Sequence, residues 1–204
     1  MIYKTNFKNY LFALLTISMI LSCNKSKITE VIIQGNIVNP MGNTIQLVGP
    51  GEMEDGTLSL NFQRETNVDE NGNFIDTLNL KSSGYFFFIH GRERTQLFLE
   101  PGDYLTINLD SKQFDESITF SGEGSENNTF LKKRFLFQEN NGVNVIEMSK
   151  LESKEYLNQI DSLKQWELNF LKENQNISNN FINIEKKNSH YKFLQALERY
   201  PLYH

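Results

Sequence analysis

The chain has 204 residues, which suits one ordinary domain, or a small domain with a helical extension, and excludes a large multidomain assembly. Hydrophobic residues make up 39% and charged residues 22% of the sequence, which is typical of a chain that buries a core and not of a disordered chain. The formal net charge of -5 gives no general attraction to phosphate backbones, so nucleic acid is not an expected partner.

The first 22 residues have the layout of an export signal. A short basic segment, with Lys4 and Lys8 and no acidic residue, precedes an apolar run from Tyr10 to Leu21. A helix that crosses a bilayer needs about 20 apolar residues, and this run is shorter. We therefore predict a signal peptide over residues 1–22 rather than a permanent membrane anchor.

The apolar run ends at the only cysteine of the chain. The segment Ile20-Leu21-Ser22-Cys23 resembles the bacterial lipobox, in which the cysteine is lipidated and becomes the mature N-terminus. The alternative is that Cys23 is a buried or incidental thiol. We predict lipidation of Cys23, a polar tether over residues 23–30, and a position in the cell envelope facing the periplasm, held at the inner or outer membrane by the lipid.

A single cysteine also limits the chemistry of the chain. It excludes an intramolecular disulfide, a Cys-x-x-Cys redox pair and a multi-cysteine metal site.

Short apolar runs separated by turn residues occupy positions 31–122, and they predict an antiparallel β-sandwich of about eight strands. Residues 31–38 and 44–48 read as one hairpin. Asn71-Gly72, a strong turn signal, predicts a second hairpin between 66–68 and 74–80.

Later strands follow the same pattern. The continuously apolar segment 85–89 predicts a central strand that is covered on both faces. Strands over 95–99 and 104–109 flank the turn Glu100-Pro101-Gly102-Asp103, and residues 118–120 would complete the sheet.

Helical spacing begins after Gly122, so we expect a helical segment over residues 123–204 and an α+β fold with three helices. Ser125 would cap a helix that runs to Gln138, and Ser149-Lys150-Leu151-Glu152 is a capping-box pattern before a helix over 150–174. A third helix is expected from Ser178 to Pro201. Its predicted apolar face consists of Phe181, Ile184, Tyr191, Leu194 and Leu197.

No catalytic, cofactor-binding or metal-binding residue is predicted. The three histidines are widely spaced, and they lack the spacing of metal ligands. Gly122-Glu123-Gly124 is interpreted as a turn and helix cap, and the acid pairs Glu100/Asp103 and Asp115/Glu116 are interpreted as solvated turn residues. The basic run Lys132-Lys133-Arg134 is interpreted as a solvated face or a salt-bridge set.

Several short phrases together resemble one family. They are Gly35, Asn71-Gly72-Asn73-Phe74, the segment from Leu97 to Asp103, Phe120-Ser121-Gly122 and Glu126-Asn127-Asn128. In this order they resemble the N-terminal region of TlpA-like thiol-disulfide oxidoreductases, which are Gram-negative envelope lipoproteins whose N-terminal domain of unknown function precedes a thioredoxin domain. Residues 191–204 resemble the helical linker before that domain.

The resemblance implies no activity, because the catalytic Cys-x-x-Cys motif and the βαβ thioredoxin framework of that family have no counterpart here. We therefore predict a non-catalytic, lipid-anchored envelope module and not an enzyme. Its partners would be the membrane and another envelope protein or a thioredoxin-like protein. One alternative is a glycan- or peptide-binding lipoprotein, for which an exposed cluster of Tyr85, Phe87 and Tyr104 would supply the surface. A second alternative is a truncated remnant of a thioredoxin-like enzyme.

Overall fold

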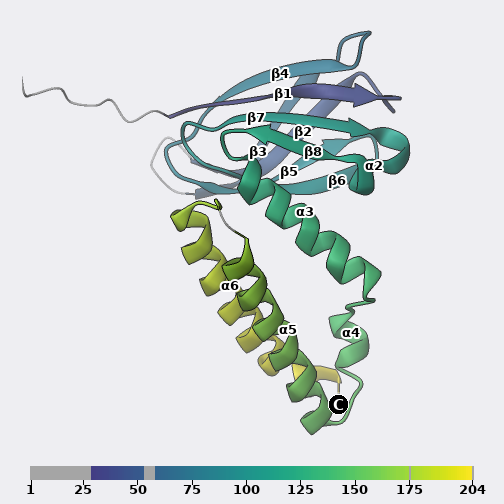
Figure 1. Cartoon of the computed structure of the whole chain (residues 1–204), viewed down its shortest axis with the longest axis vertical. Helices are drawn as coiled ribbons and strands as arrows, with labels where there is room; N and C mark the ends of the chain where they lie inside the picture. The colour runs from purple at the N-terminus through teal and green to yellow at the C-terminus, as the bar shows by residue number, and fades with distance from the viewer. Residues whose placement is uncertain (1–28, 53–57, 175, 204) are drawn as a thin grey trace, which may run out of the picture.

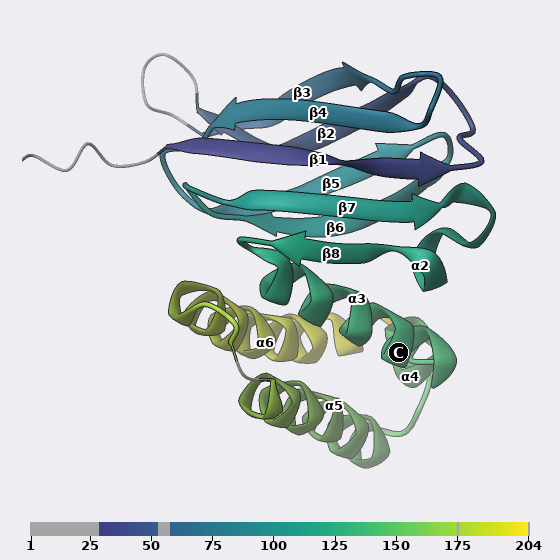
Figure 2. The same cartoon turned by 45° about the horizontal axis from the view of Figure 1, so that its top comes forward.

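Two four-stranded β-sheets pack face to face in the computed structural model, which describes residues 29–52, 58–174 and 176–203 (Figures 1 and 2). Sheet I has the strand order β4-β1-β7-β8, and sheet II has the order β3-β2-β5-β6. The strands are β1 (Glu30–Val38), β2 (Thr44–Glu52), β3 (Leu58–Asn67), β4 (Asn73–Asn79), β5 (Gly84–His90), β6 (Glu93–Leu99), β7 (Tyr104–Asp110) and β8 (Thr119–Gly122). The expected α+β sandwich with about eight strands is thus present.

The pairing of the strands differs from the predicted hairpins. β1 pairs with β4 and β7, whereas β2 pairs with β3 and β5, so β1 and β2 lie in opposite sheets. The Asn71-Gly72 turn forms, with Gly72 at a φ of 83°, but it joins β3 of sheet II to β4 of sheet I. Both hairpin predictions are therefore wrong. The prediction of a wholly antiparallel fold is also wrong, because β1 and β7 run parallel.

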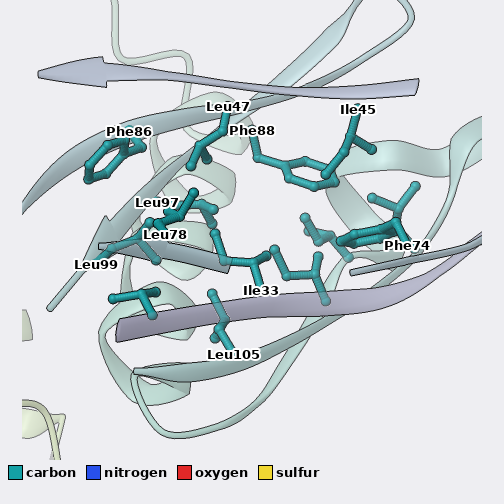
Figure 3. Close-up of a cluster of buried hydrophobic side chains, with 14 of the residues drawn as sticks. Ile33, Ile45, Leu47, Phe74, Leu78, Phe86, Phe88, Leu97, Leu99 and Leu105 are labelled. Atoms are coloured by element: carbon teal, nitrogen blue, oxygen red, sulfur yellow. The ribbon is translucent and has the colours of Figure 1, made fainter. Parts of the chain in front are cut away.

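The core lies between the inner faces of the two sheets (Figure 3). Alternate residues of β4 are buried, and the same alternation in the other strands directs one row of side chains from each strand inward. Sheet I contributes Ile33, Phe74, Leu78 and Leu105, and sheet II contributes Ile45, Leu47, Phe86, Phe88, Leu97 and Leu99. Each fully buried side chain of this size stabilises the fold by about 1.5–3 kcal/mol.

In the part of the chain that the structure describes, four α-helices follow β8, instead of the three expected. They are α3 (Ser125–Asn140), the one-turn α4 (Val145–Met148), α5 (Ser153–Glu173) and α6 (Asn179–Arg199). A short 3₁₀ helix η1 (Ser111–Gln113) and the one-turn α2 (Phe114–Ser117) precede β8, and a second 3₁₀ helix η2 (Tyr200–Tyr203) follows α6.

The helix starts agree with the sequence only in part. Ser178 caps α6 as predicted, because its hydroxyl accepts the N–H of Phe181. Ser125 is not a cap, since Gly124 occupies that position in a left-handed conformation. The predicted capping box is also absent: Ser149 ends α4, and α5 begins only at Ser153.

The helices α5 and α6 lie side by side and extend away from the sandwich, and α3 leaves the sandwich beside them (Figure 1). The buried residues of α6 are Phe181, Glu185, Ser189 and Ala196, whereas Tyr191 and Leu194 of the predicted apolar face are exposed. None of the helices in the described ranges has both the length and the apolar character needed to cross a bilayer.

Candidate functional site

The junction between sheet II and the helices is built on strand β6. In this strand Leu97 and Leu99 enter the sandwich core, and Phe98 points the opposite way into the helices. Asn128 of α3 is fully buried and pairs with the backbone of Phe98: its side-chain oxygen accepts the Phe98 N–H at 2.8 Å, and its amide donates to the Phe98 carbonyl at 3.0 Å. The helix thereby satisfies backbone groups of an edge strand, which would otherwise be open to pairing with another chain.

Aromatic side chains fill the space around this contact. The ring of Phe98 lies 4.9 Å from that of Phe181 and 5.0 Å from that of Tyr85, in edge-to-face arrangements. The ring of Phe130 of α3 also lies edge-to-face with that of Phe181, with the ring centroids 5.5 Å apart. The rings form an apolar base for α3, α5 and α6 that is separate from the sandwich core.

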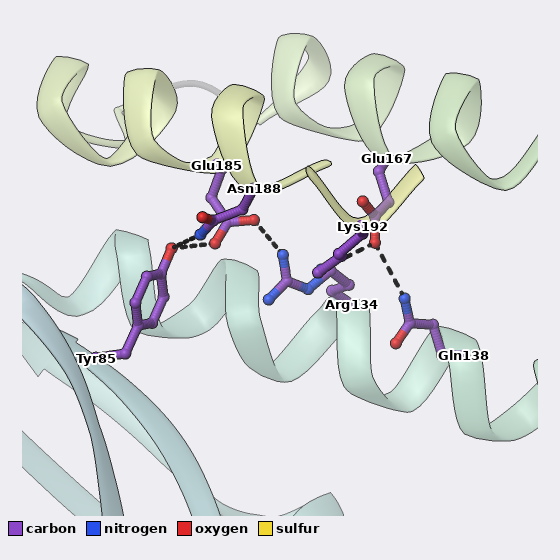
Figure 4. Close-up of polar contacts among 7 residues, drawn as sticks. All are labelled: Tyr85, Arg134, Gln138, Glu167, Glu185, Asn188 and Lys192. Carbon is purple, nitrogen blue, oxygen red and sulfur yellow. Dashed lines mark hydrogen bonds and ion pairs between the residues drawn. The ribbon is translucent and has the colours of Figure 1, made fainter. Parts of the chain in front are cut away.

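A buried carboxylate connects three elements at this junction (Figure 4). Glu185 of α6 accepts hydrogen bonds from the Tyr85 hydroxyl of β5 and from the Arg134 guanidinium of α3. Asn188 donates to the Tyr85 oxygen at 3.1 Å. Burial and the Glu185 carboxylate raise the pKa of Tyr85, so this hydroxyl remains a donor. The glutamate and its arginine are both buried, and such a pair is stable only when each polar atom has a well-placed partner.

The turn between β6 and β7 supplies a second connection. Glu100 accepts from Asn127 of α3 at 3.0 Å and from Asn180 of α6 at 2.9 Å, so one carboxylate holds the first turns of two helices. Asp103 accepts the Glu100 N–H at 2.7 Å and packs against Gly124. Burial raises the pKa of Asp103 to about 6.

The structure places the predicted surface residues apart from one another. Cys23, the only predicted site residue, lies outside the described residues. Tyr85 is partly buried under the helices, Phe87 is exposed on sheet II, and Tyr104 is exposed on β7 of sheet I. These three rings do not form one cluster. The exposure of Phe87 also shows that the helices cover the outer face of β5 only in part.

Other groups noted in the sequence have structural roles. His90 is buried, where one ring nitrogen accepts the Met41 N–H and the other donates to the Thr44 carbonyl. Lys132 donates to the carbonyl of Ile118 at 2.6 Å, and Arg134 forms the buried ion pair with Glu185, so the salt-bridge interpretation of the basic run is confirmed for Arg134.

The remaining groups fit turns and surfaces. Gly122 and Gly124 adopt left-handed conformations before α3. Asp115 and Glu116 lie on α2, and burial raises the pKa of Asp115. His190 is exposed, and His204 lies outside the described residues. No group of three or more residues suited to hold a metal ion occurs in the described ranges.

Sequence reasoning missed Asn128 and Glu185 as the centres of the junction. The signal for Glu185 was its spacing: it follows Phe181 by four residues, so it falls on the same face of α6 as a buried ring. A charged residue at such a position indicates a buried partner.

Comparisons with known proteins identify no family. No family model matches the chain, and no curated protein matches it. One similar solved structure is a "putative cell adhesion protein" from Bacteroides ovatus, with a TM-score of 0.29 and 12% identity; the match covers 47% of this chain and 43% of that chain. Similarity at this level supports no conclusion about function.

Proposed function

We propose that the chain is a non-catalytic, lipid-anchored module of the cell envelope that faces the periplasm. In this proposal the lipid on Cys23 holds the sandwich at the membrane, and α3, α5 and α6 form a firmly attached arm for an envelope protein or thioredoxin-like partner. The supporting observation is the buried Tyr85–Glu185–Arg134 network, which joins a strand to two helices.

A network of this kind supports a rigid arm for a physical reason. Any change in the angle between sandwich and helices would separate a buried carboxylate from its donors, and a buried unpaired charge costs several kcal/mol. Glu100 and Asp103, which belong to the segment that resembles the TlpA-like family, are engaged in the same attachment. Their structural role agrees with a module that carries out no chemistry.

The proposal is tested by intact-mass analysis of membrane fractions from a Gram-negative host that expresses the full chain. We expect a product that lacks residues 1–22 and carries a diacylglyceryl adduct on Cys23. The Cys23→Ser variant should lose the adduct and accumulate as precursor, whereas Ser26→Ala, a matched change in the tether, should not. Recovery of a soluble, unmodified chain that retains Met1 would contradict the proposal.

Enzymatic activity is tested separately by the reduction of insulin with dithiothreitol. The purified chain should give the same rate as its Cys23→Ser variant. A faster rate for the unmutated chain would instead support the alternative that the chain is a truncated remnant of a thioredoxin-like enzyme.

A second candidate function, the binding of a neutral glycan, rests on the outer face of sheet I. The strand register places rows of residues with uncharged side chains across this face: Asn73, Asn36, Asn108 and Thr119; Ile75, Gln34, Thr106 and Ser121; and Thr77, Ile32 and Tyr104. Amides and hydroxyls both donate and accept hydrogen bonds, as sugar hydroxyls do, and Tyr104 offers a ring for stacking. This surface replaces the predicted cluster of Tyr85, Phe87 and Tyr104.

Affinity electrophoresis through gels that contain neutral polysaccharides would test this function. Gln34→Ala and Tyr104→Ala should reduce any retardation, and Phe87→Ala, on the other sheet, should leave it unchanged. Equal migration with and without polysaccharide would exclude this candidate for the glycans used.

A further inference from the structure

The helical layer contains two separate apolar clusters with a cavity between them. The cluster nearer the sandwich includes Phe98, Phe130 and Phe181, and the cluster nearer the tip includes Tyr156 and Ala196. Between them lies a cavity of about 360 Å³ whose walls come from α5, α6, the end of α3 and the segment that leads into α4. This volume is within the range of small-molecule sites, about 300–1,000 Å³.

One wall of the cavity carries polar groups that the protein does not fully use. The Glu167 carboxylate of α5 is buried, and its contacts with Gln138 Nε2 and Lys192 Nζ are both 3.4 Å, longer than good hydrogen bonds (Figure 4). Ser189 of α6 is 3% exposed, and its hydroxyl has no hydrogen-bond partner among the described residues. Since buried polar groups are nearly always paired, the Ser189 hydroxyl indicates a missing partner at this wall, and the two long contacts of Glu167 leave its carboxylate able to accept a stronger hydrogen bond.

Positive charge lines the same cavity. Lys164, Lys192 and Arg199 contribute to its lining; Arg199 and Lys192 are exposed, and the Lys192 side chain is 53% exposed. Lys164 Nζ lies 4.3 Å from the centroid of the Phe193 ring, which forms part of the wall. The cavity thus combines a buried anion with cations that reach the solvent.

Apolar side chains supply the remaining walls. Ile160 and Leu163 of α5 and Ala196 of α6 line the cavity. A ligand that fits all three regions has a donor for Glu167 and Ser189, a negative group for the lysines and arginine, and an apolar body. A simple amine would be repelled by the three cations, and a simple carboxylate would bring no new donor to Glu167 and Ser189.

We propose that this cavity binds a small zwitterion, an apolar amino acid or a dipeptide. Its ammonium group donates to Glu167 and Ser189, its carboxylate pairs with Lys164, Lys192 and Arg199, and its side chain lies against Ile160, Leu163 and Ala196. The binding site is independent of the lipid anchor, and it goes beyond the structural role proposed above.

Isothermal titration calorimetry of the purified full chain provides the test, with L-leucine, L-phenylalanine and Leu-Leu as probes. L-Leucine has two matched controls: N-acetyl-L-leucine lacks the ammonium group, and isoamylamine lacks the carboxylate. We expect at least one zwitterion to bind and both leucine controls to bind at least about tenfold more weakly, because each lacks one charge-assisted contact.

Variants locate the binding site. Glu167→Gln should weaken binding about tenfold, and Ser189→Ala should weaken it a few-fold without loss of stability, since it removes an unpaired buried hydroxyl. Glu173→Gln is the matched control, because it removes the same charge from an exposed position of α5. The proposal is overturned if no zwitterion binds at about 10 mM, if the N-acetylated or decarboxylated controls bind equally well, or if the two cavity variants bind like the unmutated chain.

Discussion

Removal of one of the two buried charges at the junction should lower the free energy of unfolding more than removal of both. Arg134→Met leaves the Glu185 carboxylate buried without its cation, and Glu185→Gln leaves the guanidinium buried without its anion. The side chains of Arg134 and Glu185 are 10% and 3% exposed, so water cannot replace either partner. Each single variant should lose about 3–5 kcal/mol of unfolding free energy.

The double variant Arg134→Met/Glu185→Gln buries no unpaired charge. We expect it to be more stable than either single variant, with a coupling energy of at least about 2 kcal/mol. As a control, Glu198→Gln removes a carboxylate from an exposed position of α6, and it should change the free energy of unfolding by less than about 0.5 kcal/mol.

Urea denaturation followed by two probes measures these differences. The single tryptophan, Trp166, stacks on Phe137 with ring centroids 4.0 Å apart, so its fluorescence reports on the helices. Far-UV circular dichroism reports on the whole chain. If the helices are rigidly attached, the two transitions of the unmutated protein coincide. Additive single variants, or a helical transition that precedes the sandwich transition, would refute the reasoning.

Three further predictions concern the close contact at Gly35, the pH dependence of stability, and the contact of Asn128 with the backbone of β6. Gly35→Ala should cost at least about 2 kcal/mol in urea denaturation, because a Cβ there would lie 1.6 Å from the Ile107 carbonyl oxygen; Gly42→Ala, with nothing within 4 Å, should be neutral. The pKa of Asp103 is raised to about 6 in the folded chain, so folding favours the protonated form and stability falls as the pH rises from about 4 to 6. Asp103→Asn should therefore gain about 1–2 kcal/mol over the unmutated chain at pH 7 and show no gain at pH 4; a gain that is independent of pH would contradict this origin. Asn128→Ala should lower the free energy of unfolding by about 3 kcal/mol or more, because it leaves the backbone N–H and carbonyl of the buried Phe98 unpaired. Thermal denaturation measures the loss, and Asn141→Ala, which changes an exposed asparagine near the end of α3, is the control.

Only part of the junction could be predicted from the sequence. The Pro-Gly turn before Asp103 and the cap at Ser178 rest on local backbone geometry, and a single sequence shows such signals directly. The spacing of Glu185 from Phe181 places it on a buried face of α6, but the sequence does not show that Arg134 is its partner, because nothing local shows that α3 and α6 approach each other. Their burial follows from contacts between residues 51 positions apart.

The pattern of short apolar runs between turn residues by itself determined a sandwich with helices after it and most of the strands, although it marked only residues 66–68 of the segment that forms β3. It could not determine which strands pair, because an inward-facing row satisfies the same alternation in either sheet. Only the tertiary structure decided that β1 joins β4 and β7 while β2 joins β3 and β5. The cavity beside Glu167 also depends on the tertiary structure. Its walls belong to helices that are separated in the sequence, so no local sequence pattern predicts it.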